Sequence, residues 1–171
     1  MYKILGFIVV LFLVGCGYKP TSYYAKDVLG DKIYAQVMIS KVDPKNSVII
    51  KDALNEAIIT RFLGKLTTKE QADTKLFVTL GSTSFSPILY DNNGYVISYK
   101  AKVILKFKYE DKQGEIQTLS TSGEYDFPIE ANSVISESKR FEAIRYASLD
   151  AINEFVSTIS VRGMQNGKHS K

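Results

Sequence analysis

The sequence predicts an α+β fold, a two-layer sandwich in which two amphipathic helices cover one face of a four-stranded, mostly antiparallel sheet. Three observations predict it: segments whose apolar residues alternate with a period of two, two segments whose apolar residues recur every three or four positions, and turn-forming residues between them. Each predicted helix has a single apolar stripe, so both are expected on the same face of the sheet. The expected element order is β-α-β-β-β-α.

The first predicted strand and helix follow one another within the segment 32–67. Residues 32–39 alternate between apolar and polar side chains, which predicts a strand that ends before Pro44. Asn46 or Ser47 can then cap a helix, because Ser and Asn accept hydrogen bonds from the free N–H groups of a first turn. Apolar residues at three- and four-residue spacing predict that this helix continues to about Thr67.

Two turn sequences connect the remaining strands into a meander, and a second helix closes the domain. The clusters 91–94 (DNNG) and 111–114 (DKQG) both predict turns, and Pro87 is expected to end the strand before the first of them. The predicted strands cover 74–85, 95–109 and 115–127. The last helix is expected from about Ser136 to Ile159, with Gly163 as a stop.

The predicted strand 95–109 has one apolar face and one basic face, with four lysines on the basic face within nine residues. Like charges this close repel one another and are costly to bury unpaired, so this face meets either water or an anionic partner. A solvated face is the first interpretation; the functional one is that these lysines, with two bases near the start of the last helix, attract phosphate groups. The candidate phosphate-binding residues are Lys100, Lys102, Lys106, Lys108, Lys139 and Arg140.

The first fifteen residues resemble the signal peptide of a bacterial lipoprotein. Lys3 precedes an eleven-residue apolar stretch, which is too short to cross a bilayer. The sequence LVGC ending at Cys16 resembles a lipobox, with cleavage expected between Gly15 and Cys16. We therefore expect Cys16 to carry a diacylglycerol and an N-acyl chain, with palmitate among the acyl groups, that anchor the protein to a membrane. Gly17 in the next position favours the periplasmic side of the outer membrane.

Length and composition predict one folded domain behind this leader. The chain has 171 residues, of which 45% are hydrophobic and 23% charged, and a formal net charge of +4. The predicted division is a signal peptide at 1–15, a lipidated tether at 16–31, a single domain at 32–163 and a disordered tail at 164–171.

The residue types present argue against catalysis and cofactor binding. With one cysteine and one histidine, the chain lacks the residues for an internal disulfide, a CxxC site or a histidine-based triad or metal site. Serines, threonines and carboxylates fall on predicted strands and turns. We expect no enzyme activity, no metal and no cofactor apart from the acyl groups. A basic stripe could also bind nucleic acid, but export separates the mature protein from the nucleic acid of the cell.

Several motifs, taken in order, resemble one known family. These are the CGY sequence at 16–18 after the lipobox, the NGY turn at 93–95 leading into YKAKVIL at 99–105, and a closing amphipathic helix. Together they resemble the LPS-assembly lipoprotein LptE family. The resemblance implies a domain that sits as a plug inside the outer-membrane β-barrel LptD, helps it to assemble and inserts lipopolysaccharide. It also implies lipopolysaccharide contacts through basic residues near the second hairpin end and the start of the last helix.

Two other functions stay open on the sequence alone. An outer-membrane lipoprotein of similar build could bind another periplasmic ligand or envelope polymer without a barrel partner. An anchored hydrolase would lose its activity when one serine or carboxylate is changed, whereas a plug tolerates any such single change. Co-purification of a large β-barrel distinguishes the first alternative from the LptE-like function.

Overall fold

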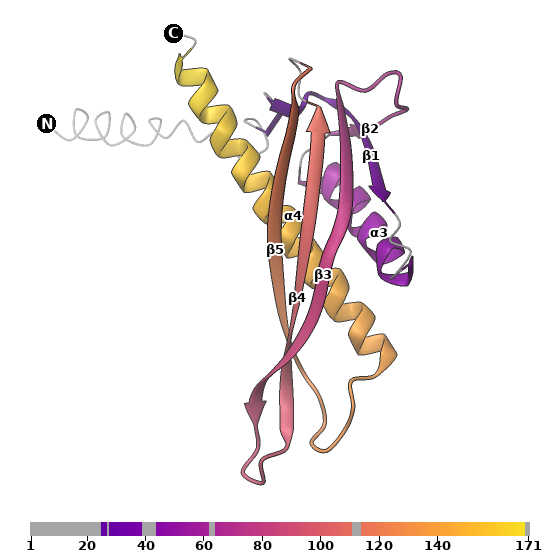
Figure 1. Ribbon diagram of the computed structural model, residues 1–171, viewed down its shortest axis with the longest axis vertical. Coiled ribbons are helices and arrows are strands. Elements are labelled where there is room, and N and C mark those ends of the chain that lie inside the picture. Colours follow the sequence, from indigo (N-terminus) through magenta and orange to yellow (C-terminus); the bar gives the residue numbers. More distant parts are fainter. Residues whose placement is uncertain (1–24, 27, 39–43, 62–63, 111–113, 170–171) are drawn as a thin grey trace, which may run out of the picture.

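The computed structural model describes residues 25–26, 28–38, 44–61, 64–110 and 114–169 (Figure 1). The predicted signal peptide, its cleavage site at Gly15 and the predicted lipid attachment at Cys16 lie outside these residues. The elements are β1 (Lys32–Met38), α3 (Pro44–Thr60), β2 (Lys65–Leu66), β3 (Thr74–Tyr90), β4 (Val96–Glu110), β5 (Ile116–Pro128) and α4 (Glu137–His169).

The five strands form one mixed sheet in the order β2-β1-β3-β4-β5. Strands β3, β4 and β5 form the predicted antiparallel meander, but β1 runs parallel to both of its neighbours. The prediction of four strands in a mostly antiparallel sheet is therefore wrong in detail. Strand β2 has only two residues, which is too short to produce a periodic pattern. Strand β1 is parallel to β3 because helix α3 carries the chain back before β3 begins.

Both helices lie on the same face of the sheet, as predicted (Figure 1). Helix α3 begins at Pro44, a residue that suits a first turn because it needs no N–H partner there. It ends at Thr60, and part of the segment expected to continue it forms β2 instead. Helix α4 continues past Gly163 to His169, so the predicted tail is helical over residues 164–169.

The inner face of β4 forms the centre of the core. Ala101, Val103, Leu105 and Phe107 are buried there, while the lysines between them point to the opposite face. The ring of Phe107 stacks on Phe155 of α4 with centroids 4.1 Å apart. The two faces predicted for this strand are confirmed.

The domain begins before the predicted boundary at Lys32. Ala25 and Leu29, placed within the expected tether, are each only 1% exposed and belong to the core. They lie one helical turn apart in a short helical segment, so both point to the same side. The chain then turns at Gly30, whose φ of 77° is readily adopted by glycine.

A carboxylate ties the start of β1 to the chain just before β3. Oδ2 of Asp73 accepts hydrogen bonds from the backbone N–H groups of Asp31 and Lys32, both at 2.9 Å. The N–H of Asp73 in turn donates to the carbonyl oxygen of Lys32 at 2.8 Å. Strand β1 is thus held at its first residue as well as along its length.

Strands β3 and β4 continue beyond the helices as a long hairpin, which forms one end of the molecule (Figure 1). Strand β3 passes through Pro87, where the sequence predicted its end. Because β1 pairs with β3 only as far as Thr79, Pro87 lies on an edge, where a missing N–H costs no ladder hydrogen bond. The predicted DNNG turn is confirmed: Oδ1 of Asp91 accepts from the N–H groups of Asn93 and Tyr95 at 2.9 and 2.8 Å.

Candidate functional site

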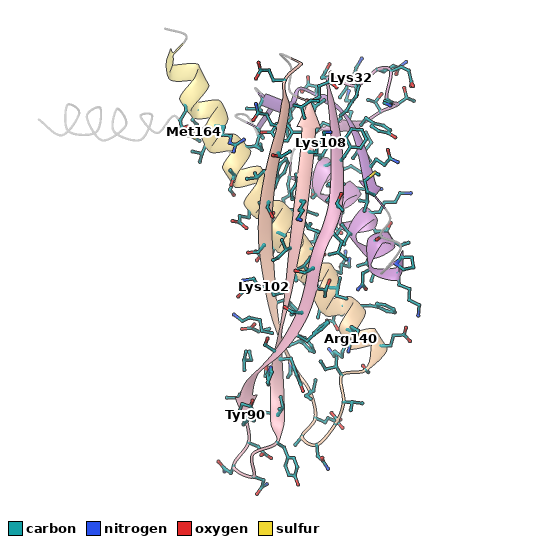
Figure 2. The ribbon with its side chains drawn as sticks, viewed as in Figure 1. Lys32, Tyr90, Lys102, Lys108, Arg140 and Met164 are labelled. Carbon is teal, nitrogen blue, oxygen red and sulfur yellow. The ribbon has the colours of Figure 1, made fainter. Side chains whose placement is uncertain are left out.

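The face of the sheet opposite the helices is the first candidate surface. It carries hydroxyl, lysine and carboxylate side chains from three adjacent strands, and among the described elements no helix packs on it (Figure 2). We call the part nearer the β3–β4 turn, 100–104 of β4 beside 122–126 of β5, the hairpin half. We call the part farther from it, 106–109 of β4 beside 117–120 of β5, the far half.

In the hairpin half the predicted lysines have acidic neighbours. Lys100 and Lys102 lie opposite Asp126 and Glu124 of β5. Nζ of Lys100 is 2.7 Å from Glu124 Oε2 and 3.8 Å from Asp126 Oδ1, and Nζ of Lys102 is 3.0 Å from Glu124 Oε1. The hydrogen bond to Glu124, with the nearby charge of Asp126, raises the pKa of Lys100. Hydrogen bonds from Lys100 and then Lys102 lower the pKa of Glu124.

In the far half the predicted lysines have neutral neighbours. Lys106 lies opposite Ser120, and Lys108 opposite Thr118. Among the described residues, no carboxylate lies within ion-pair distance of either lysine. Their small neighbours leave a shallow hollow of about 390 Å³ on this face, which Thr79 also lines. The sequence pattern of alternating lysines is the same in both halves, but only the far half leaves its lysines without a described counter-charge.

Helix α4 closes the backbone edge of β5 in the hairpin half. The N–H of Ser122 donates to Glu154 Oε2 at 2.9 Å, and the N–H of Glu124 donates to Asp150 Oδ2 at 3.0 Å. These acceptors satisfy N–H groups that an edge strand otherwise exposes. A further strand therefore cannot pair with β5 at these two positions without displacing α4 carboxylates.

The close approach of α4 to β5 depends on Gly123. A Cβ at this position would overlap the backbone of Ala147 and Ala151 in α4. Beside it, Oγ1 of Thr121 donates to the carbonyl oxygen of Ala151 at 2.6 Å. Backbone contact between helix and strand is possible here because glycine has no side chain.

The second candidate surface is the hairpin end, which exposes large apolar side chains. Ile88, Leu89, Tyr90 and Tyr95, around the β3–β4 turn, are 42–54% exposed. A backbone hydrogen bond of 3.0 Å from Ile129 N–H to the Ile97 carbonyl holds the segment after β5 beside this hairpin. That segment and the first turn of α4 line a hollow of about 490 Å³. Ile129 and Val134 contribute apolar side chains to it, Lys139 a basic one and Glu130 an acidic one.

The two predicted bases of the last helix lie in the first turns of α4. Figure 2 shows Arg140 between the levels of Lys102 and Tyr90, toward this end of the molecule. Nζ of Lys139 pairs with Glu142 in the next turn at 3.0 Å, and it also lines the hollow. The guanidinium carbon of Arg140 lies 4.7 Å from the ring centroid of Phe85, and no described carboxylate pairs with it. The structure therefore brings Lys139 and Arg140 to the hairpin end, at a distance along β4 from Lys106 and Lys108.

Two features of these surfaces were missed by the sequence analysis. The exposed apolar residues after Pro87 do not follow from the sequence prediction, which ends the strand at the proline. The run ILY that follows Pro87 is the available sign in the sequence. The closure of β5 by Asp150 and Glu154 had no such sign, because those residues are ordinary polar positions of an amphipathic helix until their strand partner is known.

Metal centres and membrane-spanning helices are absent from the described ranges. No three His, Cys, Asp or Glu side chains there lie close enough together to hold a metal ion. No helix there is both long and apolar enough to cross a membrane.

The fold and its surfaces define a two-layer α+β domain with one polar sheet face and one apolar hairpin end. The family model of the lipopolysaccharide-assembly protein LptE matches residues 34–159 of this chain. The chain belongs to the LptE family, which confirms the resemblance seen in its motifs.

Solved structures share the fold at low sequence identity. A crystal structure of a protein from Caulobacter crescentus CB15 matches with a TM-score of 0.52 and 8% identity, over 84% of this chain and 96% of that chain. A crystal structure of a protein from Xanthomonas campestris matches with a TM-score of 0.51 and 10% identity, over 81% of this chain and 87% of that chain. At these identities the matches show a common fold. Comparison with curated proteins finds no match.

Proposed function

We propose that this protein is the lipoprotein subunit of a lipopolysaccharide translocon in the outer membrane. It is anchored on the periplasmic side through acyl chains on Cys16, plugs an LptD-like β-barrel, assists the assembly of that barrel and binds lipopolysaccharide during insertion. The observation that carries the proposal is the match of the LptE family model to residues 34–159. The protein acts by shape and charge, without catalysis and without a metal or other cofactor.

The free face of the sheet supports the barrel partner. A wide β-barrel has a polar interior, so a plug inside it must present polar side chains to the wall. The sheet presents them on the face that carries no described helix, while the apolar core lies between sheet and helices. The residues of that face include Thr79, Ser84, Ser86, Lys100, Lys102, Lys106, Lys108, Thr118, Ser120, Glu124 and Asp126.

The hairpin end supports the lipopolysaccharide contact. Lipopolysaccharide combines acyl chains with phosphate groups, so its binding surface needs apolar and basic side chains together. The hairpin end supplies both, through exposed residues such as Leu89 and Tyr90 and through Lys139 and Arg140 nearby. Arg140 is better suited than Lys100 and Lys102, because no described carboxylate pairs with it, whereas Glu124 and Asp126 pair with those lysines. Lys139 shares its charge with Glu142.

The central experiment isolates the protein from detergent-solubilised membranes and identifies what accompanies it. We expect a large β-barrel in a defined ratio, and we expect depletion of the protein to reduce mature barrel and surface lipopolysaccharide. Mass spectrometry should find the acyl groups on Cys16. Recovery of the lipoprotein alone, with normal surface lipopolysaccharide after depletion, contradicts the proposal and favours a lipoprotein that binds another envelope ligand.

The lipopolysaccharide contact is tested with two matched double variants. Lys139→Gln with Arg140→Gln removes two charges from the hairpin end, and Lys100→Gln with Lys102→Gln removes two from the paired lysines. We expect the first to weaken lipopolysaccharide binding about 10-fold at low salt, since two charge contacts are lost. The second should change it less than about 2-fold, and the difference should shrink at high salt. Equal effects would remove the hairpin end from the mechanism.

A further inference from the structure

The far half of β5 has an open backbone edge. Ser122 and Glu124 direct their N–H groups away from β4, since both donate to α4. The register between β4 and β5 is continuous, so the backbone N–H groups of alternate β5 residues point in the same direction. The N–H groups of Thr118 and Ser120 therefore also point away from β4. Among the described residues, no hydrogen bond from either outward N–H to α4 or to any other element is seen. An outward row of N–H and C=O groups is a template for an added strand.

The same half also lacks the acidic row that completes the hairpin half. There, Glu124 and Asp126 occupy alternate positions of β5 and pair with the lysines across the strand. In the far half the corresponding positions hold Thr118 and Ser120 instead. Each half thus has two lysines at alternate positions. In the hairpin half, the chain itself supplies both the carboxylates that pair with the lysines and the acceptors that close the strand edge.

We propose that the far half binds an extended segment of a partner protein, which adds as a strand beside β5 and carries acidic side chains at alternate positions. Such a strand supplies the acceptors and donors that Thr118 and Ser120 lack. Its alternate side chains face the hollow between Lys106 and Lys108, where the small hydroxyl residues leave room for carboxylates. Ile116, 64% exposed at the start of β5, offers an apolar contact at the same edge.

Two independent features favour a polypeptide over a free anion. A phosphate group or an anionic headgroup would neutralise Lys106 and Lys108 but would leave the backbone of Thr118 and Ser120 unpaired. An extended acidic chain satisfies both the charges and the backbone. This inference does not rest on the proposed translocon function, because it follows from the sheet edge and its charges alone.

The experiment uses the full chain and a short synthetic peptide in which glutamate alternates with valine and threonine. Two further peptides serve as probes: one of the same sequence with N-methylated backbone amides, and one of the same composition in scrambled order. Binding is followed by fluorescence anisotropy at low salt, and hydrogen exchange reports the backbone amides. We expect the alternating peptide to bind and to slow exchange at Thr118 and Ser120. The other two peptides should bind at least about 10-fold more weakly.

Variants of the protein separate charge from backbone pairing. Lys106→Gln with Lys108→Gln should weaken binding of the alternating peptide about 10-fold, whereas Lys100→Gln with Lys102→Gln should change it less than about 2-fold. Thr118→Pro removes one outward N–H, and Thr118→Val keeps it as the matched control; only the proline variant should lose binding. Thermal unfolding of each variant establishes that it is folded, and the N-methylated peptide makes the same test on the unaltered protein.

Three results would overturn the inference. The first is no binding of the alternating peptide at low salt. The second is equal binding of all three peptides, which means attraction by charge without strand addition. The third is binding of anionic lipid vesicles or lipopolysaccharide that depends on Lys106 and Lys108 while the exchange of Thr118 and Ser120 stays unchanged.

Discussion

The hairpin half and the far half of the β4–β5 pair repeat one lysine pattern in different surroundings. In the first half two lysines pair with Glu124 and Asp126, and carboxylates of α4 close the strand edge. In the second half the lysines face hydroxyl residues and the edge is open. A charge stripe in one strand therefore does not define a binding site by itself. Whether such a stripe can bind a partner depends on the charges of the neighbouring strand and on what covers the edge of that strand.

The largest expected effect on stability comes from disrupting the contact between α4 and the hairpin half at Gly123. Gly123→Ala places a methyl group against the backbone of Ala147 and Ala151, and neither helix nor strand can move aside without repacking the core. We expect a loss of about 3 kcal/mol in the free energy of unfolding, measured with urea. Ser120→Ala, on the exposed face of the same strand, is the control and should change stability by less than about 0.5 kcal/mol. Equal stability of the two variants would show that α4 does not need this contact.

A smaller effect is expected from opening the same edge without adding volume. Asp150→Ala with Glu154→Ala removes the acceptors for the N–H groups of Ser122 and Glu124. Because water can replace part of these hydrogen bonds, we expect a cost of about 2 kcal/mol. Amide exchange at Ser122 and Glu124 should become faster, while exchange elsewhere in β5 changes little. Glu142→Ala, which removes only a pair with Lys139, is the control, and faster exchange in that variant too would argue against specific closure.

The smallest expected effect is a pH dependence of the paired lysines. The folded state lowers the pKa of Glu124, so its contribution to stability is present above the ordinary glutamate pKa and is lost as the pH falls through the lowered value. The folded state raises the pKa of Lys100, so that contribution is present below the ordinary lysine pKa and is lost as the pH rises past the raised value. Glu124→Gln should therefore flatten the stability profile at both extremes. Thermal melts across pH check this, and high salt should diminish the difference; an unaltered profile would mean that the exposed pairs contribute nothing.

Much of the fold could be predicted from the sequence, because the spacing of apolar residues indicates which side chains face the core. The inner residues of β4 and both helices followed from their patterns. Strand β2 could not be predicted, since two residues show no periodicity. The parallel pairing of β1 with β3 could not be predicted either, because it depends on where in the sheet the chain returns after α3. The extension of β3 through Pro87 depends on β1 ending early, which is a property of the sheet and not of the local sequence.

The candidate site was predicted only as a set of residue types. The sequence identified the four lysines of β4 as sharing one face, which the structure confirms. The sequence could not show that two of these lysines have acidic partners and two do not, because Glu124 and Asp126 come beside Lys100 and Lys102 only through the register of β5. Lys139 and Arg140 were grouped with the lysines by charge, and the structure places them at the hairpin end instead. Cross-strand register and helix placement decide these roles, and both arise from tertiary contacts.

The place of β1 in the sheet has a mechanical consequence. After the short helical segment that holds Ala25 and Leu29, the chain enters the sheet through a strand that lies between β2 and β3. Asp73 accepts hydrogen bonds from backbone N–H groups at the start of this strand. A pull on the N-terminal segment is therefore resisted by hydrogen bonds on two sides of an interior strand, instead of peeling away an outer one. Tension that reaches β1 is therefore shared between its two neighbouring strands before β1 can detach.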